Sequence, residues 1–404
     1  MAKFTKKPDF PPSPYNYDTR WATFKMPRLP HGPWLYRKMV HPPDARVPNG
    51  SLVEVRNRDG VLLGHGLLNR QSEVVIRMLA GPTESGGFRE ILRDRLRSAL
   101  YLREDVLKLR STTNAYRLVH GEGDRLSGLI VDRYASTAIV LLHSLGYVHH
   151  GAMLEEELLS IPGIDRVVFR ADPHVAKQEG FSVPAPTEER PVLVQEGPVR
   201  LEVDLVHGHK SGMFLDQRDQ RRLFASMCTG QRVLDLCTNT GGFALHSAVA
   251  GKAKEVIGLD LDEAALKQAA ANAKLNGAKV SWLHADLFPY LRERAAASEH
   301  WPRMVLDPPR LAKGQKDLSK ALRQYHDMNR LAIAALSPRG LLLSCSCSSV
   351  VTETAFHQVL HDASLQAGRE VRVLGSYGAA PDHPWVTGFP EGRYLKAVLL
   401  QAVT

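Results

Sequence analysis

The chain reads Val233-Leu234-Asp235-Leu236-Cys237-Thr238-Asn239-Thr240-Gly241-Gly242-Phe243 near the middle of its 404 residues. Its first four residues are apolar apart from one aspartate, which is typical of a strand buried on both faces of a parallel sheet. Tight turns favour Gly, or Asn where a positive φ is needed, and both residues follow the strand. The stretch therefore predicts a strand, a loop that faces a ligand, and the start of a helix.

More apolar strands follow and alternate with helical stretches. They are expected at residues 256–259, 280–284, 304–306, 340–344 and 395–400. Continuous apolar strands between helices indicate an α/β domain whose parallel sheet is covered on both faces. We therefore expect one such domain from about residue 199 onward.

Two smaller units are expected before this domain. Residues 1–28 are Pro-rich and basic without a period, and we interpret them as a flexible arm. Short strands and a helix at residues 88–102 form the first unit. The second unit, residues 113–181, has expected strands at 115–119, 128–134, 137–141 and 166–170, with a helix at about 147–159 between the last two. The Pro- and Glu-rich residues 182–198 are interpreted as a linker.

Charge and composition narrow the class of protein. The net charge of +9 favours a polyanionic partner, and 44% hydrophobic residues is ordinary for a globular protein. The sequence contains no run of eighteen apolar residues, so we expect no membrane-spanning helix. Four cysteines in so long a chain suggest a reducing cytoplasm rather than a disulfide scaffold. A row of arginines on the predicted helix is either a solvated face or a phosphate-contacting one: Arg89, Arg93, Arg95, Arg97 and Arg103.

The loop after residue 236 points to a nucleoside-bearing ligand. It is neither a GxGxxG fingerprint nor a nucleotide P-loop, which counts against dinucleotide binding and ATPase activity. Asp260 ends the second strand, where a carboxylate can accept hydrogen bonds from ribose hydroxyls. Asp286 follows the third strand and can meet the exocyclic amine of an adenine. For Asp286, as for Asp262, the alternative is a helix N-cap.

A rigid turn follows the next predicted strand. Asp307-Pro308-Pro309 combines a carboxylate with prolines that fix φ, so it can face a planar base and bind its edge. Methyltransferases that act on amines often have an aromatic residue after this turn, whereas this chain has Arg310. The arginine indicates a substrate that is anionic or carries phosphate.

The strand after that ends in Ser346-Cys347-Ser348. Carbon 5 of a pyrimidine is a poor nucleophile, and addition of a thiolate to carbon 6 activates it. Cys347 is therefore predicted to be a nucleophile, with nearby cations or a helix N-terminus favouring its thiolate. Cys345 is interpreted as a buried structural cysteine. We expect no metal site, because Cys345 and Cys347 are too closely spaced for zinc and no second pair follows.

Several ordered motifs together resemble the rRNA large-subunit methyltransferase I family, which makes 5-methylcytosine in 23S rRNA with S-adenosylmethionine. The resemblance covers nearly everything after residue 29. The matching stretches are His31–Tyr36, Ala115–Val119, Gly121–Asp124, Gly212–Arg218, Thr240–Phe243, Asp307–Pro309, Ser346–Ser348, Asp382–Pro384 and Pro390–Leu395.

This resemblance implies three domains after the arm. They are a PUA-like RNA-binding domain (29–104), a small α+β domain of strand–strand–helix–strand–strand (EEHEE) order (113–190), and a Rossmann-like methyltransferase domain (195–404). It carries the nucleophile role to Cys347 and the base-edge role to Asp307. The cofactor-binding residues expected from the loop and from the resemblance are Gln217, Arg218, Asp235, Cys237, Thr240, Gly241, Asp260, Asp286 and Asp307.

Two departures from the family stand out. Arg310 replaces the usual lysine, and Asn239 replaces a frequent aromatic residue. The base that removes the carbon-5 proton is not identified by the sequence, because no second cysteine follows Asp307-Pro308-Pro309.

Other functions stay open. They are methylation of uracil carbon 5, methylation of a guanine amine, and a non-catalytic role as an RNA-binding ribosome-assembly factor. The expected partner is 23S rRNA or a large-subunit precursor, with no membrane involved. The oligomeric state is open, a homodimer included.

Overall fold

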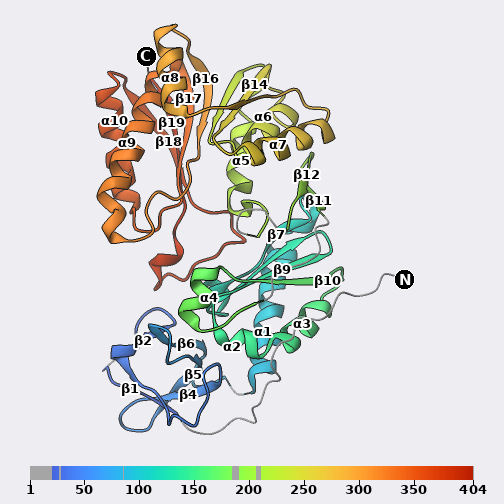
Figure 1. The fold of residues 1–404 in the computed structure, drawn as a ribbon, viewed down its shortest axis with the longest axis vertical. Coiled ribbons are helices and arrows are strands. Elements are labelled where there is room, and N and C mark those ends of the chain that lie inside the picture. Colours follow the sequence, from blue (N-terminus) through green and yellow to red (C-terminus); the bar gives the residue numbers. More distant parts are fainter. Residues whose placement is uncertain (1–20, 27–28, 85, 184–190, 206–210, 404) are drawn as a thin grey trace. The chain divides into compact units, whose positions relative to one another are not determined.

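Two compact units make up the computed structural model, which describes residues 21–26, 29–84, 86–183, 191–205 and 211–403. Unit 1 consists of Met1–Val192, Asp204–Gly212 and Pro381–Gly392. Unit 2 consists of Leu193–Val203, Met213–Ala380 and Arg393–Thr404. Figure 1 shows the chain coloured along its sequence, and the two units are described separately below.

Unit 1 begins with a six-stranded sheet in the order β2-β6-β5-β4-β1-β3. Its strands are β1 (Ala22–Phe24), β2 (Trp34–Tyr36), β3 (Val40–His41), β4 (Leu52–Arg56), β5 (Leu62–Leu68) and β6 (Val74–Ala80). A 3₁₀ turn, η1 (Arg37–Met39), joins β2 to β3. The sheet encloses a small apolar core that includes Phe24, Leu35 and Ile76.

Strand β1 corrects part of the expected N-terminal arm. Residues 22–24 pair with β3 and with β4, and Ala22 and Phe24 are buried. The alternation of buried and half-buried residues explains the strand, but a three-residue alternation is too short to stand out in a sequence. The arm's remaining residues, 1–20 and 27–28, lie outside the described part of the chain.

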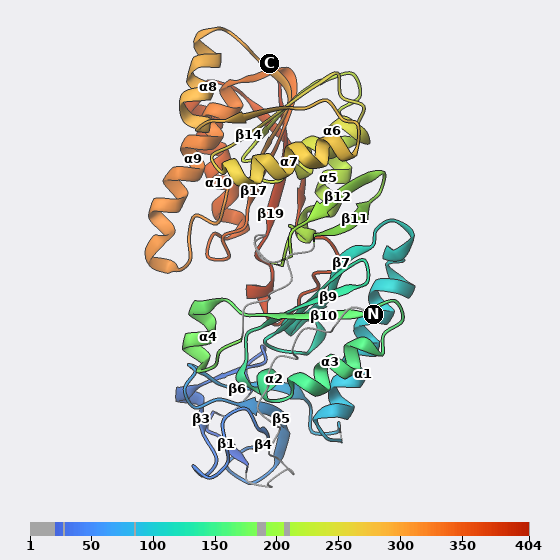
Figure 2. The ribbon, with the colours of Figure 1, turned by 45° about the vertical axis from the view of Figure 1, so that its right-hand side comes forward.

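The second part of unit 1 is a four-stranded sheet in the order β10-β9-β8-β7. Helices α1 to α3 lie together on one face of it (Figure 2). The strands are β7 (Ala115–His120), β8 (Leu129–Tyr134), β9 (Thr137–Leu142) and β10 (Arg166–Arg170). The helical segments are α1 (Phe88–Leu100), η2 (Tyr101–Val106), η3 (Leu109–Ser111), η4 (Gly121–Asp124), α2 (Leu145–His149), α3 (Gly151–Leu159) and α4 (Pro173–Glu179).

The order of these elements confirms the strands and the helix expected from the residues, but it differs from the EEHEE order implied by the resemblance. Three strands precede the helical pair α2–α3 and one strand follows it. The reason is the pairing: β7, β8 and β9 are antiparallel neighbours, whereas β10 runs parallel to β9. Parallel neighbours need a long crossover, usually helical, so the helices must lie between β9 and β10.

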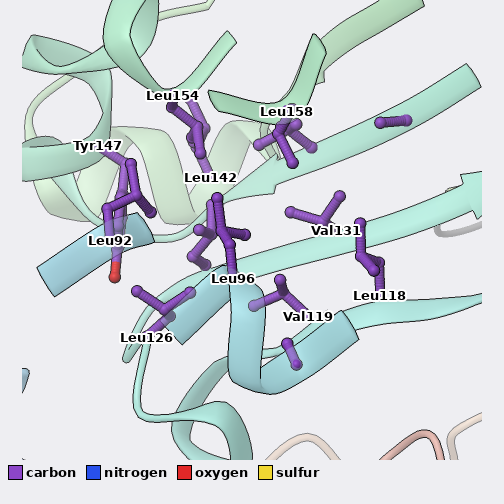
Figure 3. Close-up of a cluster of buried hydrophobic side chains, with 14 of the residues drawn as sticks. Leu92, Leu96, Leu118, Val119, Leu126, Val131, Leu142, Tyr147, Leu154 and Leu158 are labelled. Atoms are coloured by element: carbon purple, nitrogen blue, oxygen red, sulfur yellow. The ribbon is translucent and has the colours of Figure 1, made fainter. Parts of the chain in front are cut away.

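Leucine side chains from α1 fill the space between this sheet and its helices. Leu92 and Leu96 of α1 belong to the same cluster of buried side chains as Leu118 and Val131 of the sheet, and Figure 3 shows Leu92 beside Tyr147 of α2. Leu92, Leu118 and Val131 are fully buried, and Leu96 is nearly so. The predicted helical spacing of apolar residues in α1 is therefore confirmed as the core-facing side of the helix.

Most of the arginines predicted on or near α1 are neutralised by carboxylates. Arg89 and Arg93 both form ion pairs with Glu157 of α3, and Arg95 pairs with Glu84. Arg103, in η2, is fully buried and holds Asp124 through two hydrogen bonds of 2.5 and 2.7 Å. This part of unit 1 therefore presents far less free positive charge than the arginine row suggests.

Residues 381–392 belong to unit 1, although strands of unit 2 flank them in the sequence. Arg103 donates to the main-chain oxygen of Asp382 at 2.7 Å, and the Asp382 carboxylate accepts from the amide of Arg117 at 2.9 Å. Phe389 packs edge-on against Trp34 of β2, with ring centroids 4.7 Å apart. Two of the motifs quoted above, around Asp124 and Asp382, thus have structural roles inside unit 1.

Unit 2 is built on a seven-stranded sheet in the order β15-β14-β13-β16-β17-β19-β18. Helices α5, α6 and α7 cover one face and α8, α9 and α10 the other (Figure 1). The strands are β13 (Arg232–Leu236), β14 (Glu255–Asp260), β15 (Ser281–His284), β16 (Trp301–Leu306), β17 (Leu336–Ser346), β18 (Val371–Tyr377) and β19 (Lys396–Ala402). The helices are α5 (Arg218–Ala225), α6 (Gly242–Val249), α7 (Glu263–Leu275), α8 (Leu287–Ala296), α9 (Leu318–Ala334) and α10 (Glu353–Gln366).

Unit 2 differs from the sequence expectation in three ways. Strand β19 runs antiparallel to both β17 and β18, so the sheet is mixed rather than wholly parallel. Strand β18 was not predicted, because its exposed position lacks the apolar run of the buried strands. Part of the predicted linker forms β11 (Val192–Glu196), which pairs with β12 (Val199–Val203).

Short segments complete the structure. They are η5 (Leu215–Gln217) and η6 (Gln315–Asp317) in unit 2, and η7 (Pro390–Gly392) in unit 1. Across the described ranges, no helix is both long enough and apolar enough to cross a membrane.

Candidate active site

The predicted site residues gather at one edge of the unit 2 sheet. Strands β13, β14, β15, β16 and β17 are parallel, so their carboxyl ends lie at the same edge. Open α/β sheets bind ligands beyond this edge. The structure therefore brings the ends of strands that are far apart in sequence into one region.

The loop after β13 adopts the conformation that its sequence predicted. Cys237, Asn239 and Gly241 have φ angles of 61°, 49° and 83°. Gly241 is required for a second reason, since a Cβ there would lie 2.6 Å from the Trp282 ring. The amide of Gly241 donates to the Thr238 oxygen at 2.9 Å, which closes the turn and leaves Thr240 half-buried at its tip.

Asp235 supports this loop from below. One carboxylate oxygen accepts hydrogen bonds from the Thr238 hydroxyl at 2.5 Å and from the Ala244 amide at 2.9 Å. Burial raises the pKa of Asp235 to about 7, despite these two hydrogen bonds, and the charges of Asp307 and Asp260 raise it further. Asp235 thus ties the loop to the first turn of α6.

Asp260 and Asp286 differ in exposure and in partners. Half-buried Asp260 accepts the amide of Asn239 at 2.7 Å and that of Asp262 at 2.9 Å, one on each oxygen. Each carboxylate oxygen has two lone pairs, so Asp260 can still accept hydroxyl groups. Asp286 is exposed and caps α8 by accepting the Phe288 amide at 2.8 Å, as its N-cap interpretation predicted. Asp262 caps α7 in the same way.

Gln217 and Arg218 lie at the start of α5 and are both nearly fully buried. Among the described residues, the Gln217 Oε1 and Asp235 Oδ1 atoms are buried without a hydrogen-bond partner. Buried polar atoms are normally paired, so these two atoms are candidates for contacts with a bound ligand. Together with a left-handed loop and carboxylates that suit hydroxyl and amine donors, they fit the expected S-adenosylmethionine.

The carboxylate and the cation of the predicted reacting end lie around the β16 terminus. Asp307 follows the last residue of β16 and is half-buried, and its amide donates to Leu236 at 3.3 Å. Arg310 is exposed, and its guanidinium donates to the Ala312 oxygen at 3.1 Å and to the Ser349 hydroxyl at 3.3 Å. Arg310 therefore bridges the turn after β16 and the turn after β17.

Cys347 occupies the first position after β17 and is partly exposed. The next residue, Ser348, is fully buried, and its hydroxyl accepts the Ala312 amide and contacts the Tyr325 hydroxyl, both at 3.1 Å. These hydrogen bonds fix the backbone beside the thiol. Cys347 is thus the cysteine of the strand end that is held in place and still reachable.

The other three cysteines are in environments that keep them protonated. Burial raises the pKa of Cys228 to about 11. Burial also raises the pKa of Cys237 far above its usual range, and the neighbouring Asp260 and Asp307 carboxylates add to the effect. Cys345 is fully buried, and burial together with Asp307 raises its pKa in the same direction. The structural interpretation of Cys345 is consistent with this, whereas Cys237 contributes shape to the loop.

One residue beside Cys347 was not predicted. Lys396, the first residue of β19, is 5% exposed and donates to the main-chain oxygens of Ser348 at 2.6 Å and Tyr394 at 2.8 Å. Its signal in the sequence was a single charge at the head of an otherwise apolar strand, Lys396-Ala397-Val398-Leu399-Leu400. Such a charge is costly to bury, and it is usually functional or well paired.

Nothing in the described residues provides a cluster of three or more His, Cys, Asp or Glu that could hold a metal ion. The absence of a metal in the reaction stays a prediction.

Comparison with known proteins now identifies the family. The chain is 34% identical over 378 residues to "Ribosomal RNA large subunit methyltransferase I" of Aeromonas salmonicida, covering 92% of this chain and 95% of the relative. The protein of the same name from Aeromonas hydrophila is 35% identical over 379 residues, with the same coverage. The chain belongs to the ribosomal RNA large subunit methyltransferase I family.

Both expected domain types are confirmed. Residues 177–387 match the S-adenosylmethionine-dependent methyltransferase family, and residues 29–80 match the PUA-like domain. The chain is therefore an S-adenosylmethionine-dependent methyltransferase with an N-terminal PUA-like domain. Among solved structures, SMU.776, described as a methyltransferase and crystallised with SAH, has a TM-score of 0.77. It is 18% identical and the match covers 92% of this chain and 95% of that one, so it supports the fold alone.

Proposed function

We propose that this member of the ribosomal RNA large subunit methyltransferase I family methylates carbon 5 of a cytosine in 23S rRNA through a covalent Cys347 adduct. The observation that carries the proposal is the position of Cys347: a partly exposed thiol at a strand end, held beside Arg310 and Lys396. The relatives are named for the RNA of the large ribosomal subunit, which supports the choice of substrate.

The chemistry explains why a cysteine is needed. The Cys347 thiolate forms a bond to carbon 6 of the ring, and the carbon 5–carbon 6 double bond gives its electron pair to make carbon 5 nucleophilic. S-adenosylmethionine would supply a methyl group on a sulfonium, and carbon 5 would take it up as the methyl–sulfur bond breaks and S-adenosylhomocysteine leaves. A base then removes the carbon-5 proton, the double bond re-forms and the thiolate leaves. Methylation of an amine needs none of these steps.

Asp307 is proposed to hold the edge of the base. Its half-buried carboxylate follows β16 and precedes a proline turn, so it is rigid and close to the strand end that carries Cys347. A carboxylate accepts the exocyclic amine of cytosine, whereas uracil offers only its ring N–H at this edge. Uracil carbon 5 is the runner-up for that reason, and guanine amine transfer would leave Cys347 without a role.

The remaining expectations belong to the same proposal. The cofactor-binding set is Gln217, Arg218, Asp235, Cys237, Thr240, Gly241, Asp260, Asp286 and Asp307, with Arg310 beside the reacting base. The PUA-like domain is proposed to bind RNA, and the net charge of +9 supports a polyanionic partner. The domain limits 29–104, 113–190 and 195–404, a cytoplasmic location and the assembly state stay predictions.

The proposal is tested by the identity of the product. Unmodified 23S rRNA is incubated with the protein and S-adenosylmethionine labelled in its methyl group, and the RNA is digested to nucleosides for mass spectrometry. We expect the label in 5-methylcytidine. Label in 5-methyluridine or in a methylguanosine would overturn the cytosine assignment. Absence of label from both free RNA and large-subunit particles would favour a non-catalytic RNA-binding role.

A further inference from the structure

Lys396 is a buried lysine at a position of β19 where the sheet itself does not require a charged side chain. It lies opposite Ser346 in the β17–β19 ladder, at the position where the chain leaves β17 towards Cys347. Its ammonium group donates to two main-chain oxygens, those of Ser348 and Tyr394. Burying an ammonium group costs free energy that two neutral acceptors offset only in part. Burial accordingly lowers the pKa of Lys396 to about 8.

The charged groups around Cys347 come from four elements. Lys396 approaches from β19, and Arg310 from the turn after β16. The Tyr325 hydroxyl of α9 contacts the Ser348 hydroxyl at 3.1 Å, and a negative charge on Cys347 would raise the pKa of both Tyr325 and Lys396. Glu353, at the start of α10, is held by Arg393 at 2.7 Å. These contacts put a buried cation directly on the backbone that carries the thiol.

We propose that Lys396 is a positioning residue for Cys347: its ammonium group fixes the main chain at Ser348 and stabilises the neighbouring thiolate. The inference rests on the proposed covalent function of Cys347. A nearby cation favours the charged form of a thiol, and the displaced proton passes to solvent. Burial and the charge of Asp307 raise the pKa of the neighbouring Cys345, and a cation beside Cys347 opposes that effect at the same strand end.

Alkylation of Cys347 in the free protein measures this effect without methyl transfer. Peptide mass spectrometry follows the rate of iodoacetamide modification at Cys347 in the full-length wild type and in Lys396→Met. The assay is repeated at pH values from 5.5 to 10. Thiolate alone reacts, so the midpoint of the profile reports the thiol titration. We expect a wild-type midpoint below the ordinary ~8.5 and a midpoint about one unit higher in Lys396→Met. At pH 7 this shift corresponds to an alkylation rate about ten times lower.

The control is Lys267→Met, because Lys267 is 75% exposed on α7 and pairs with Glu263 in the same helix. It should leave the profile unchanged, and Lys396→Arg should restore most of the wild-type midpoint. A melting curve and the affinity for S-adenosylmethionine exclude general unfolding. If Lys396→Met does not fold, Lys396→Gln takes its place.

Identical profiles for wild type and Lys396→Met would overturn the inference, as would a wild-type midpoint at or above 8.5. Neither result contradicts the proposed function. The proposed function is contradicted by a different result, full methyl transfer by Cys347→Ala. The two claims are therefore distinguished by one set of proteins.

Discussion

The carboxylate of Asp260 accepts a hydrogen bond of 2.7 Å from the backbone amide of Asn239, which is in the left-handed region at φ 49°. The end of β14 thereby holds the loop that follows β13. A charge-assisted hydrogen bond of this kind fixes a backbone conformation that an unsupported loop would seldom keep.

Asp260→Ala should weaken S-adenosylmethionine binding by about 10- to 100-fold, because a hydrogen bond to a charged group contributes roughly 1.5–3 kcal/mol. Isothermal titration calorimetry measures the change. Asp262→Ala is the matched control: it removes the α7 cap and should cost about 1 kcal/mol of stability with little effect on affinity. Equal losses of affinity in both variants would contradict a specific role for Asp260.

The two cysteines of the β17 end should behave differently. Cys347→Ala should reduce the rate of methyl transfer at least about 1000-fold while S-adenosylmethionine still binds, since it removes the nucleophile and not the pocket. Cys345→Ala shortens a fully buried side chain and should lower stability by about 1 kcal/mol with activity largely kept. Single-turnover assays and urea unfolding check both. Full activity of Cys347→Ala would remove the covalent mechanism.

The loop and the strand ends were predictable because their signals are local. A glycine at positive φ, an apolar strand and a proline turn each depend on a few neighbouring residues. The role of Lys396 and the partners of Asp124 and Asp382 could not be predicted, because they depend on contacts between residues distant in sequence. Arg103 and Asp382, for example, are 279 positions apart. Strand β18 was missed because its pattern is carried by exposed residues rather than by an apolar run.

Glu196 predicts how stability depends on pH. It is buried with Arg221, which donates to both its oxygens at 2.8 Å, and with His246 at 3.1 Å. Burial alone would raise the pKa of Glu196, but Arg221 and His246 lower it well below its usual range. The unfolded chain therefore binds this proton more readily, and the stabilisation is complete above about pH 4.5 and lost as the pH falls below that.

Glu196→Gln should cost about 3–5 kcal/mol at pH 7, because it leaves Arg221 buried without its carboxylate. The difference in free energy of unfolding between wild type and Glu196→Gln should become smaller as the pH of the assay is lowered from 5 to 3. Urea unfolding followed by circular dichroism gives the free energies. If the difference in free energy of unfolding did not change with pH, the ion pair would not be the cause of the loss of stability at low pH.

The stability of unit 1 should depend strongly on Arg103. It is fully buried and donates to Asp124, Arg117 and Asp382, so Arg103→Met leaves a buried carboxylate and several carbonyl groups unpaired. We expect a loss of about 3–5 kcal/mol. Arg97→Met, on the exposed side of α1, should stay within about 0.5 kcal/mol of wild type. Similar stabilities for the two variants in urea unfolding would contradict this account of the buried network.

The most direct test of the central claim is to trap the adduct between Cys347 and the target base. Large-subunit rRNA is transcribed with 5-fluorocytidine and incubated with the protein and S-adenosylmethionine. Fluorine cannot be removed as a proton, so the reaction should stop after methyl transfer with sulfur bound to carbon 6. The account predicts a cross-linked peptide containing Cys347, absent from Cys347→Ala and from RNA made with 5-fluorouridine. An adduct formed only with the 5-fluorouridine RNA, or none with an RNA whose ordinary cytidine form is methylated, would contradict it.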